Sequence, residues 1–489
     1  MQTDIIQESG GDNTKLGVTP MDQLPGPPGV PLLGNVLQIN IKKLHRTIEN
    51  WSNEYGTIFK IKLGAIPVVV ITAPEAIQYV LKNRPDKFRR MNKMDTVIRE
   101  MGVQGVFNAE GKDWKRQRRL VSQALNIQHL KSFFPVLADI TAILLRYWTN
   151  LSAQGASVDV KGELMRYTVD VTAQLAFGHT MNTIEKKENV IQQHLEIIFP
   201  AIFRRMNAPI PYWRFVKLPA DKKLDKSLKV VNKAMQDVID KTRDELKQPG
   251  AAGNQPSNFL QALLASDPDD PISNQEVIGN VLTMLLAGED TTAHTLTWII
   301  YFMHVFPGVQ QKMQQEADLV LADENVLKNY DDVQRLRYME AVAFEAMRLK
   351  PVSPTLFHDA LEDVVIAGVA IPKGTGIFLQ THLAAISEEH FSDAGKFIPE
   401  RWMEGGCPAG NTHNQKAYFP FGAGPRFCPG YQLAMLEIKT VLAMVCKNFE
   451  VRMETNPDTV DEVLTFTMKP SDFFIKLTKR KKSGQPPSS

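Results

Sequence analysis

Helical periodicity runs almost without interruption from about residue 74 to about residue 350, and this block constrains the fold more than any other feature. Alternating, β-branched segments lie outside the block, at 57–72, 361–380 and 463–477. The first of them predicts a hairpin with its turn near Gly64, and the last predicts another hairpin. The sequence therefore predicts a mainly α-helical protein with a small β-rich subdomain.

Two segments interrupt the helical block. Residues 199–219 carry prolines among aromatic and aliphatic residues, and we expect this apolar loop to be a lid over a cavity. Residues 249–271 are polar, and we expect a plain surface connection there. At the ends of the chain we expect disorder, in the polar residues 1–20 and in the basic tail 479–489.

Charge and cysteine content exclude several classes of protein. The chain has 56 Lys and Arg residues against 54 Asp and Glu residues, so nothing suggests a nucleic-acid partner. Its 3 cysteines are too few for a disulfide framework, which favours a reducing compartment. The N-terminus lacks the apolar core of a secretory signal, and no stretch of about 20 apolar residues provides a transmembrane anchor. We therefore expect a soluble, cytoplasmic protein.

Cys428 lies between a glycine-rich turn and the apolar segment 431–446, which predicts a helix. A cysteine at a helix N-terminus faces the positive end of the helix dipole and unpaired N–H groups, so we expect a lowered pKa and a thiolate. Thiolate is the form that an axial iron ligand requires. Gly430 leaves space for a flat macrocycle, and Arg426 is placed to pair with a propionate. A buried structural thiol is the alternative, and it suits Cys446 better.

The spacing of residues around this cysteine matches a known signature. The pattern FxxGxRxCxG is matched without a substitution by Phe421, Gly424, Arg426, Cys428 and Gly430. On these residues the chain resembles the cytochrome P-450 family. The resemblance implies the cytochrome P-450 fold as a single domain over residues 21–478, although length alone predicts about three domains. It also implies that haem b is the cofactor, that Cys428 is the axial ligand of its iron, and that Phe421 shields the sulfur.

A long apolar helix with a polar centre is predicted between Ser273 and Phe306. Its start is marked by a capping box, in which Ser273 and Glu276 satisfy each other's backbone N–H groups. Its middle has the sequence Ala-Gly-Glu-Asp-Thr-Thr at 287–292, in which the Gly, the Asp and the two Thr are poor helix formers. Such a conflict between local preference and the surrounding pattern is typical of functional sites.

The family has the same pattern at this point of its long helix. The resemblance implies that Ala287 and Gly288 leave space for dioxygen beside the helix. It further implies two catalytic residues: Thr291, whose hydroxyl contacts the oxygen molecule, and Asp290, which connects that hydroxyl to a proton source. A kinked core helix whose polar residues face solvent is the alternative interpretation.

Two further sets of residues fit the resemblance. Glu345 and Arg348 lie three apart on one predicted helix face, and the family's pattern adds Arg401 to form a structural triad. Trp114 and Arg118 also share a helix face, and the resemblance implies that they reach a haem propionate.

His358 stands where many family members carry an arginine that binds a propionate. Histidine is neither bidentate nor permanently charged, so the resemblance leaves open whether His358 contacts the haem. Lys112, Arg116 and Arg119 form a basic face next to that of Trp114. We expect this face to dock a ferredoxin- or flavin-type electron donor, and a solvated cationic surface is the alternative.

The residues that line the substrate cavity by analogy with the family are apolar: Val106, Phe107, Met284, Leu285, Val352, Leu356, Phe357 and Phe466. We therefore expect a hydrophobic small-molecule substrate that is held by shape. The expected activity is a monooxygenase that inserts one oxygen atom from O2, with electrons from NAD(P)H through a separate redox partner, and we expect a monomer.

Two other functions are compatible with a haem-thiolate site. One is a peroxide-driven enzyme, such as a peroxygenase or an isomerase, and the other is a haem-based ligand sensor. Because the acid–alcohol pair of Asp290 and Thr291 is intact, the sequence favours the monooxygenase.

Overall fold

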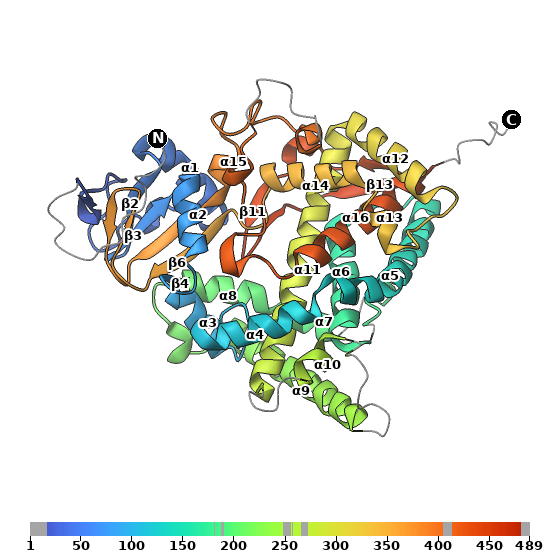
Figure 1. Cartoon of the computed structure of the whole chain (residues 1–489), viewed down its shortest axis with the longest axis horizontal. Coiled ribbons are helices and arrows are strands. Elements are labelled where there is room, and N and C mark those ends of the chain that lie inside the picture. Colours follow the sequence, from blue (N-terminus) through green and yellow to red (C-terminus); the bar gives the residue numbers. More distant parts are fainter. Residues whose placement is uncertain are drawn as a thin grey trace.

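The structure of the protein is a computed structural model that describes residues 17–179, 181–186, 190–247, 256, 258–265, 272–403 and 413–480. The expected disorder at residues 1–16 and 481–489, most of the expected connection at 249–271, and Cys407 lie outside the described residues. Helices fill most of the molecule, and the larger sheet lies to one side of them (Figure 1). The prediction of a mainly helical protein with a small β-rich part is confirmed.

The helices and strands are defined as follows. The helices are α1 (Leu44–Tyr55), α2 (Pro74–Lys82), α3 (Asn92–Glu100), α4 (Gly111–Ala124), α5 (Ile127–Ala153), α6 (Val160–Phe177), α7 (Val190–Leu195), α8 (Ile198–Asn207), α9 (Pro219–Leu246), α10 (Phe259–Leu264), α11 (Asn274–Val305), α12 (Pro307–Leu321), α13 (Tyr330–Val333), α14 (Arg337–Leu349), α15 (Thr381–Ala385) and α16 (Tyr431–Asn448). The strands are β1 (Thr19–Pro20), β2 (Ile58–Leu63), β3 (Ile66–Ile71), β4 (Phe88–Arg90), β5 (Val158–Asp159), β6 (Thr355–Ala360), β7 (Val364–Ile366), β8 (Val369–Ile371), β9 (Gly376–Gln380), β10 (Phe449–Met453), β11 (Glu462–Leu464), β12 (Met468–Pro470) and β13 (Phe474–Lys479).

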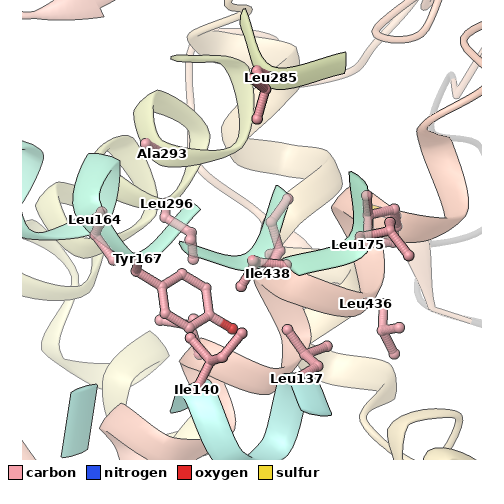
Figure 2. Close-up of a cluster of buried hydrophobic side chains, with 14 of the residues drawn as sticks. Leu137, Ile140, Leu164, Tyr167, Leu175, Leu285, Ala293, Leu296, Leu436 and Ile438 are labelled. Atoms are coloured by element: carbon pink, nitrogen blue, oxygen red, sulfur yellow. The ribbon is translucent and has the colours of Figure 1, made fainter. Parts of the chain in front are cut away.

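Helix α11 is the central element of the fold. It has 32 residues and begins with the predicted capping box, in which Ser273 donates its backbone N–H to Glu276 at 2.9 Å and accepts from the Glu276 N–H at 3.2 Å. Its apolar side chains pack with those of α5, α6 and α16 into one core, where Tyr167, Leu296 and Ile438 lie close together (Figure 2). Burial on nearly all sides explains why the sequence of α11 is apolar over most of its length.

Four sheets contain the strands of the described chain. The largest has the order β2-β3-β9-β6-β4, and the hairpin β2–β3 turns at Gly64, whose positive φ of 65° suits glycine. A second sheet has the order β1-β8-β7. The remaining two, β10-β13-β5 and β11-β12, pack against the helices, and β12 contacts α11.

The predicted hairpin over 463–477 is wrong in its pairing. β11 pairs with β12, whereas β13 pairs with β10 and β5, because Ile475 and Leu477 turn into the helical core. The structure also differs from the prediction at the inner ends of the two terminal segments that we expected to be disordered. Thr19 is bonded through its N–H to Gly368 O at 2.9 Å, and Arg480 binds Asp318 at 2.8 Å, so partners fix the inner ends of both segments expected to be disordered.

The two predicted loops are partly helical. Residues 198–207 form α8, because Pro200 falls in the first helical turn, where proline is tolerated. The remainder of the expected lid turns its aromatic side chains in different directions: Trp213 is buried and donates to Glu100 at 2.8 Å, while Phe215 is exposed. In the second loop, the described residues include α10. Among the described residues, no helix combines the length and the hydropathy needed to cross a membrane.

Candidate active site

Cys428 lies in the last turn before α16. Its backbone N–H donates to Phe421 O at 2.9 Å, and Gly430 caps the helix that begins at Tyr431. The thiol is half-buried, and its sulfur faces the backbone N–H groups of Gly430 and Tyr431. The structure therefore places this sulfur at a helix N-terminus, as the spacing predicted.

The expected lowering of the Cys428 pKa is not what the structure gives. Burial raises the pKa of this thiol above its ordinary value, and the two backbone N–H groups and the charge of Arg118 oppose that rise only in part. The protein alone therefore favours the thiol, and a metal ion bound at this sulfur would supply the positive charge that favours the thiolate.

Two positions of the loop are occupied by glycine for different structural reasons. Gly424 has a positive φ of 68°, and a side chain there would meet Leu81 O at 2.6 Å, so it allows the loop to approach α2. For a side chain on Gly430, the nearest atom is the Cys428 sulfur at 3.8 Å. The backbone beside the sulfur is therefore bare, and the space suits a flat ring. The Phe421 ring stands edge-on to Tyr431 at 4.8 Å, beside this loop.

A cluster of buried cations lies near the thiol. Burial lowers the pKa of Arg426 to about 9, and it lowers the pKa of Arg90 and His358 well below their usual values, with neighbouring arginines adding to each effect. The Arg426 guanidinium lies 4.4 Å from the Trp114 ring centre. Arg118 is half-buried, and its charge acts on Cys428.

The cation cluster holds the carboxylate of Glu110 but keeps unused donors. Glu110 pairs with Arg426, lies 3.6 Å from Arg84, and accepts the backbone N–H of Arg90 at 3.0 Å. Arg84 Nε, Arg426 Nε and His358 Nδ1 are buried and have no hydrogen-bond partner among the residues that the structure describes. Because buried donors without acceptors are costly, the cluster suits a ligand that brings further carboxylates.

Sequence reasoning missed Arg84, Arg90 and Glu110. The signal that points to Arg90 is a strand register, since β4 pairs Arg90 with His358 of β6. Arg84 and Glu110 lie far from Cys428 in sequence and come to it only through the tertiary fold. Glu110 is the N-cap residue of α4, next to the predicted Trp114.

The predicted triad is fully assembled behind this site. Arg348 donates to both Glu345 oxygens, and Arg401 donates to Glu345 Oε1 at 3.1 Å. Glu345 also accepts from Trp402 at 2.9 Å and from the N–H of Ile398 at 2.8 Å. Burial alone would raise the pKa of Glu345, but these donors and charges hold it below its ordinary value.

The centre of α11 presents different side chains to different neighbours. Ala287 is exposed, and Thr291 donates its hydroxyl to Ala287 O at 2.7 Å, so both lie on an accessible face. Gly288 faces α6 instead, because a side chain there would meet Thr172 Cγ2 at 2.3 Å. Its lack of a side chain therefore serves helix packing, which differs from the expected space for dioxygen. Asp290 is half-buried and accepts from Thr467 at 3.4 Å.

The basic face of α4 differs from the prediction at one residue. Lys112 and Arg119 are exposed, as expected for a surface that meets a partner. Arg116 is half-buried and pairs with Glu276 of α11, so it is drawn into the fold. Lys115 is exposed on the same helix and was not predicted.

Part of the expected cavity lining forms an aromatic wall. Phe466 stacks on Phe199 of α8 at 4.8 Å between ring centres, and it lies 6.0 Å from Phe107. The Arg90 guanidinium lies over the Phe107 ring, 3.6 Å from the ring centre. Phe199 was not predicted as a lining residue.

The other expected lining residues are distributed differently. Val106 and Met284 are partly buried beside the helical core, and Val352 accepts the Met468 N–H at 2.8 Å. Phe357 packs edge-on against Phe378, and Leu356 packs on the core of the large sheet. Leu285 is 1% exposed and lies within the helical core (Figure 2).

A flat ring that carries carboxylates would fit against the bare backbone beside Cys428, and its carboxylates would balance the surplus of buried positive charge. Among the described residues, no group of three or more His, Cys, Asp and Glu side chains is arranged to hold a metal ion directly. The iron of such a ring needs only the one sulfur as its protein ligand. The fold and this site define a haem-thiolate protein.

The comparisons with known proteins agree. The family model for cytochrome P-450 matches residues 24–477, and the chain belongs to the cytochrome P-450 family. It is similar to protein LUTEIN DEFICIENT 5, chloroplastic, of Arabidopsis thaliana, with 26% identity over 89% of this chain and 74% of the relative. It is similar to cytochrome P-450 3A6 of Oryctolagus cuniculus, with 27% identity over 88% and 86% of the two chains. Cytochrome P-450 4d10 of Drosophila mettleri is 28% identical over 93% and 91%.

Membership of the family fixes the class of reaction. The protein is an oxidoreductase of the monooxygenase type, with haem as its cofactor, and it uses O2 together with a redox partner.

Proposed function

We propose that the protein inserts one oxygen atom from O2 into a hydrophobic small molecule, with electrons that NAD(P)H supplies through a separate ferredoxin- or flavin-type protein. The observation that carries this proposal is the position of Cys428. Its sulfur lies at the start of α16, beside a bare backbone and a buried cation cluster. Haem bound at this sulfur supplies the activation of dioxygen.

The chain's own residues would hold the haem at two points. Cys428 would bind the iron. The backbone of Gly430 borders its sulfur, and Phe421 accepts the Cys428 backbone N–H. The carboxylates would meet the buried cation cluster, which we define as the guanidinium groups of Arg84, Arg90 and Arg426. The neutral His358, the half-buried Arg118 and the Trp114 ring adjoin this cluster. The unused donors of His358, Arg84 and Arg426 support this assignment. A neutral His358, whose pKa is lowered well below its usual value by burial, would donate a hydrogen bond without adding charge.

Thr291 and Asp290 are proposed as the proton-handling residues. The Thr291 hydroxyl holds its proton at Oγ1 and uses it in a bond to Ala287 O, within the helix. Rotation about one side-chain bond would release that proton toward the accessible face. Burial raises the pKa of Asp290 to about 6, so its carboxyl exchanges protons near neutral pH.

The aromatic wall supports a hydrophobic substrate. Phe107, Phe199 and Phe466 come from three separate parts of the chain and present ring faces and edges, which favour apolar and flat groups. The Arg90 guanidinium beneath Phe107 donates to Phe107 O at 3.1 Å and is covered by the ring. Arg90 therefore supports the aromatic wall from within the fold. A wall of apolar rings favours a substrate that is held by shape.

We propose that the redox partner docks on the exposed basic residues of α4. Lys112, Lys115 and Arg119 are exposed on the helix that also carries Trp114 and Arg118. Their positive charge suits an acidic donor protein, and the docking should weaken as salt is added. We further propose that the protein acts as a monomer. The thiols of Cys428 and Cys446 are free, which supports a reducing, cytoplasmic location.

The test of the proposed function is spectroscopic and catalytic. The haem-loaded protein should give a reduced carbonyl complex at the red-shifted position of thiolate ligation, and Cys428→Ser should lose that shift. Cys446→Ser, which removes a buried thiol elsewhere, is the matched control and should keep it. With a reductase system and NAD(P)H, screened hydrophobic compounds should be hydroxylated. Turnover that requires added peroxide, or ligand binding without any turnover, would replace the monooxygenase by one of the two alternatives.

A further inference from the structure

The carboxyl of Asp290 lies against residues outside its own helix. The hairpin β11–β12 packs on α11, and Thr467, which precedes β12, donates its hydroxyl to Asp290 Oδ2 at 3.4 Å. The same hydroxyl lies 3.3 Å from Nδ1 of His294, one turn further along α11. Thr467 is 5% exposed and His294 is 1% exposed. One buried hydroxyl therefore links two titratable groups of the helix.

The number of protons that Asp290, Thr467 and His294 carry limits the ways in which these three groups can hydrogen-bond. When Asp290 is ionised, it can only accept, so Thr467 donates to Asp290 and the remaining contact needs a proton on His294 Nδ1. When Asp290 is protonated, it can donate to Thr467, whose own hydrogen then turns toward Nδ1. The orientation of the Thr467 hydroxyl is thus coupled to the charge on Asp290. His294 stays neutral in both states, because burial lowers its pKa to about 3, so its single proton lies on Nδ1 in the first state and on Nε2 in the second.

Charges from several elements face the Asp290 carboxyl. Burial raises its pKa, Lys469 of β12 and Lys161 of α6 lower it, and Glu196, between α7 and α8, raises it. Lys469 is itself half-buried, which lowers the pKa of its ammonium group. Lys161 forms an ion pair with the exposed Asp472, so its charge is partly balanced at the surface.

On α11 itself, two charged or titratable groups adjoin Asp290. Glu289 is 3% exposed, and burial together with Asp290 raises its pKa well above the usual range, which keeps it neutral. His294 is neutral as well. Of the two lysines that act on the carboxyl, Lys161 is held in an ion pair, whereas Lys469 forms no ion pair with a described residue. Burial lowers the pKa of Lys469, and the charges of Asp290 and Asp472 oppose that lowering only in part.

We propose that Thr467 is a positioning residue for Asp290 and that Lys469 is its counter-charge, so that hairpin β11–β12 governs the proton supply at Thr291. This proposal rests on the proposed function, because it assigns Asp290 and Thr291 to proton transfer. In the step, a proton leaves the Asp290 carboxyl toward the Thr291 side and is replaced from solvent. The carboxyl returns to its starting state, and no oxidant or reductant is consumed in the transfer itself.

The first experiment measures the carboxyl directly. The haem-loaded full chain is titrated while the Asp290 carboxyl band is followed by infrared difference spectroscopy, and Asp290→Asn identifies the band. Lys469→Met should raise the apparent pKa of Asp290 by about one unit or more, a tenfold rise in proton affinity. Lys469→Arg should restore it. Lys476→Met, an exposed lysine of β13 that pairs with Glu454, is the matched control and should leave the band unmoved. An equal titration in wild type and Lys469→Met overturns the proposal.

The second experiment measures the coupling of electron uptake to product. Thr467→Val removes the hydroxyl at nearly constant shape, so the fraction of NAD(P)H that yields product should fall several-fold, with peroxide released instead. Thr467→Ser should restore the fraction, and Thr459→Val, at an exposed threonine before the hairpin, should not change it. Unchanged coupling in Thr467→Val overturns the positioning role. If that variant does not fold, the Lys469 series decides alone.

The two proposals fail in different ways. If the wild-type carbonyl spectrum lacks the thiolate shift, the proposed function fails, and the infrared titration of Asp290 still reports whether Lys469 sets its charge. If the spectrum and turnover are normal in every variant but neither titration nor coupling moves, only the inference about the hairpin fails.

Discussion

Arg348 donates Nε to one oxygen of Glu345 at 2.9 Å and a terminal amino group to the other at 2.8 Å, with neither side chain exposed to solvent. The second amino group of Arg348 donates to Ala385 O at 2.8 Å and Ala394 O at 2.7 Å. The pair therefore joins α14 to the irregular chain that leads toward Cys428. Because every donor has an acceptor, the cost of burying the two charges is offset.

Replacing Arg348 by lysine should destabilise the fold strongly. A lysine keeps the charge but cannot bridge both Glu345 oxygens and the carbonyl groups at once, so unpaired buried groups remain. We expect a loss of about 3 kcal/mol in the free energy of unfolding. Denaturant unfolding measures it, with Arg335→Lys as the control, because Arg335 pairs with Asp332 at an exposed site. A loss equal to that of the control would show that the triad is not a structural lock.

The buried carboxyl of Asp290 should make stability depend on pH in a defined window. Burial raises its pKa from 3.8 to about 6, so between these values the folded state binds more protons than the unfolded state. The contribution of Asp290 to the free energy of unfolding should therefore fall by about 3 kcal/mol as pH rises from about 4 to about 6, at about 1.4 kcal/mol per unit. Asp290→Asn should remove this slope, which a series of urea unfolding curves would show. Asp331→Asn, at an exposed aspartate, is the control.

Local patterns were sufficient for the elements that are built from adjacent residues. The capping box predicted the start of α11 because its two partners are three residues apart. The same holds for the hairpin β2–β3 and for the position of Cys428 before α16. In each case the physical cause lies within a few residues along the chain.

The remaining features depend on contacts that no local pattern contains. The pKa of Cys428 rises because the folded chain buries its sulfur, an effect that outweighs the helix N-terminus that the sequence revealed. Gly288 is required by Thr172, a residue of another helix. The separation of β13 from β11–β12 follows from packing against the helical core. Tertiary packing decided each of these outcomes.

Gly424→Ala should be far more damaging than Gly422→Ala. Both residues have a positive φ, 68° and 73°, so each alanine carries the same backbone strain of about 1 kcal/mol. Only at position 424 would the new methyl group meet Leu81 O at 2.6 Å, whereas at position 422 no atom of the described residues lies within 4 Å of it. We expect an additional loss of about 2 kcal/mol and weaker haem retention. Equal unfolding midpoints for the two variants would contradict the close approach of this loop to α2.

Removing the charge of Glu110 should affect the haem-free protein more than the haem-loaded protein. Without haem, Glu110 is the carboxylate that pairs with Arg426 and lies 3.6 Å from Arg84. Glu110→Gln should therefore lower the stability of the haem-free chain by about 3 kcal/mol, because buried cations lose a partner.

In the haem-loaded protein, the propionates would balance the same cations, so we expect less than half of that loss. The measurement is urea unfolding of wild type and Glu110→Gln, each with and without haem. Asp113→Asn, at an aspartate whose side chain is 76% exposed, is the control for removing a negative charge from the start of α4. An equal loss in both states would mean that Glu110 and the propionates do not share these cations. The cluster around Arg426 would then be a purely structural ion-pair network.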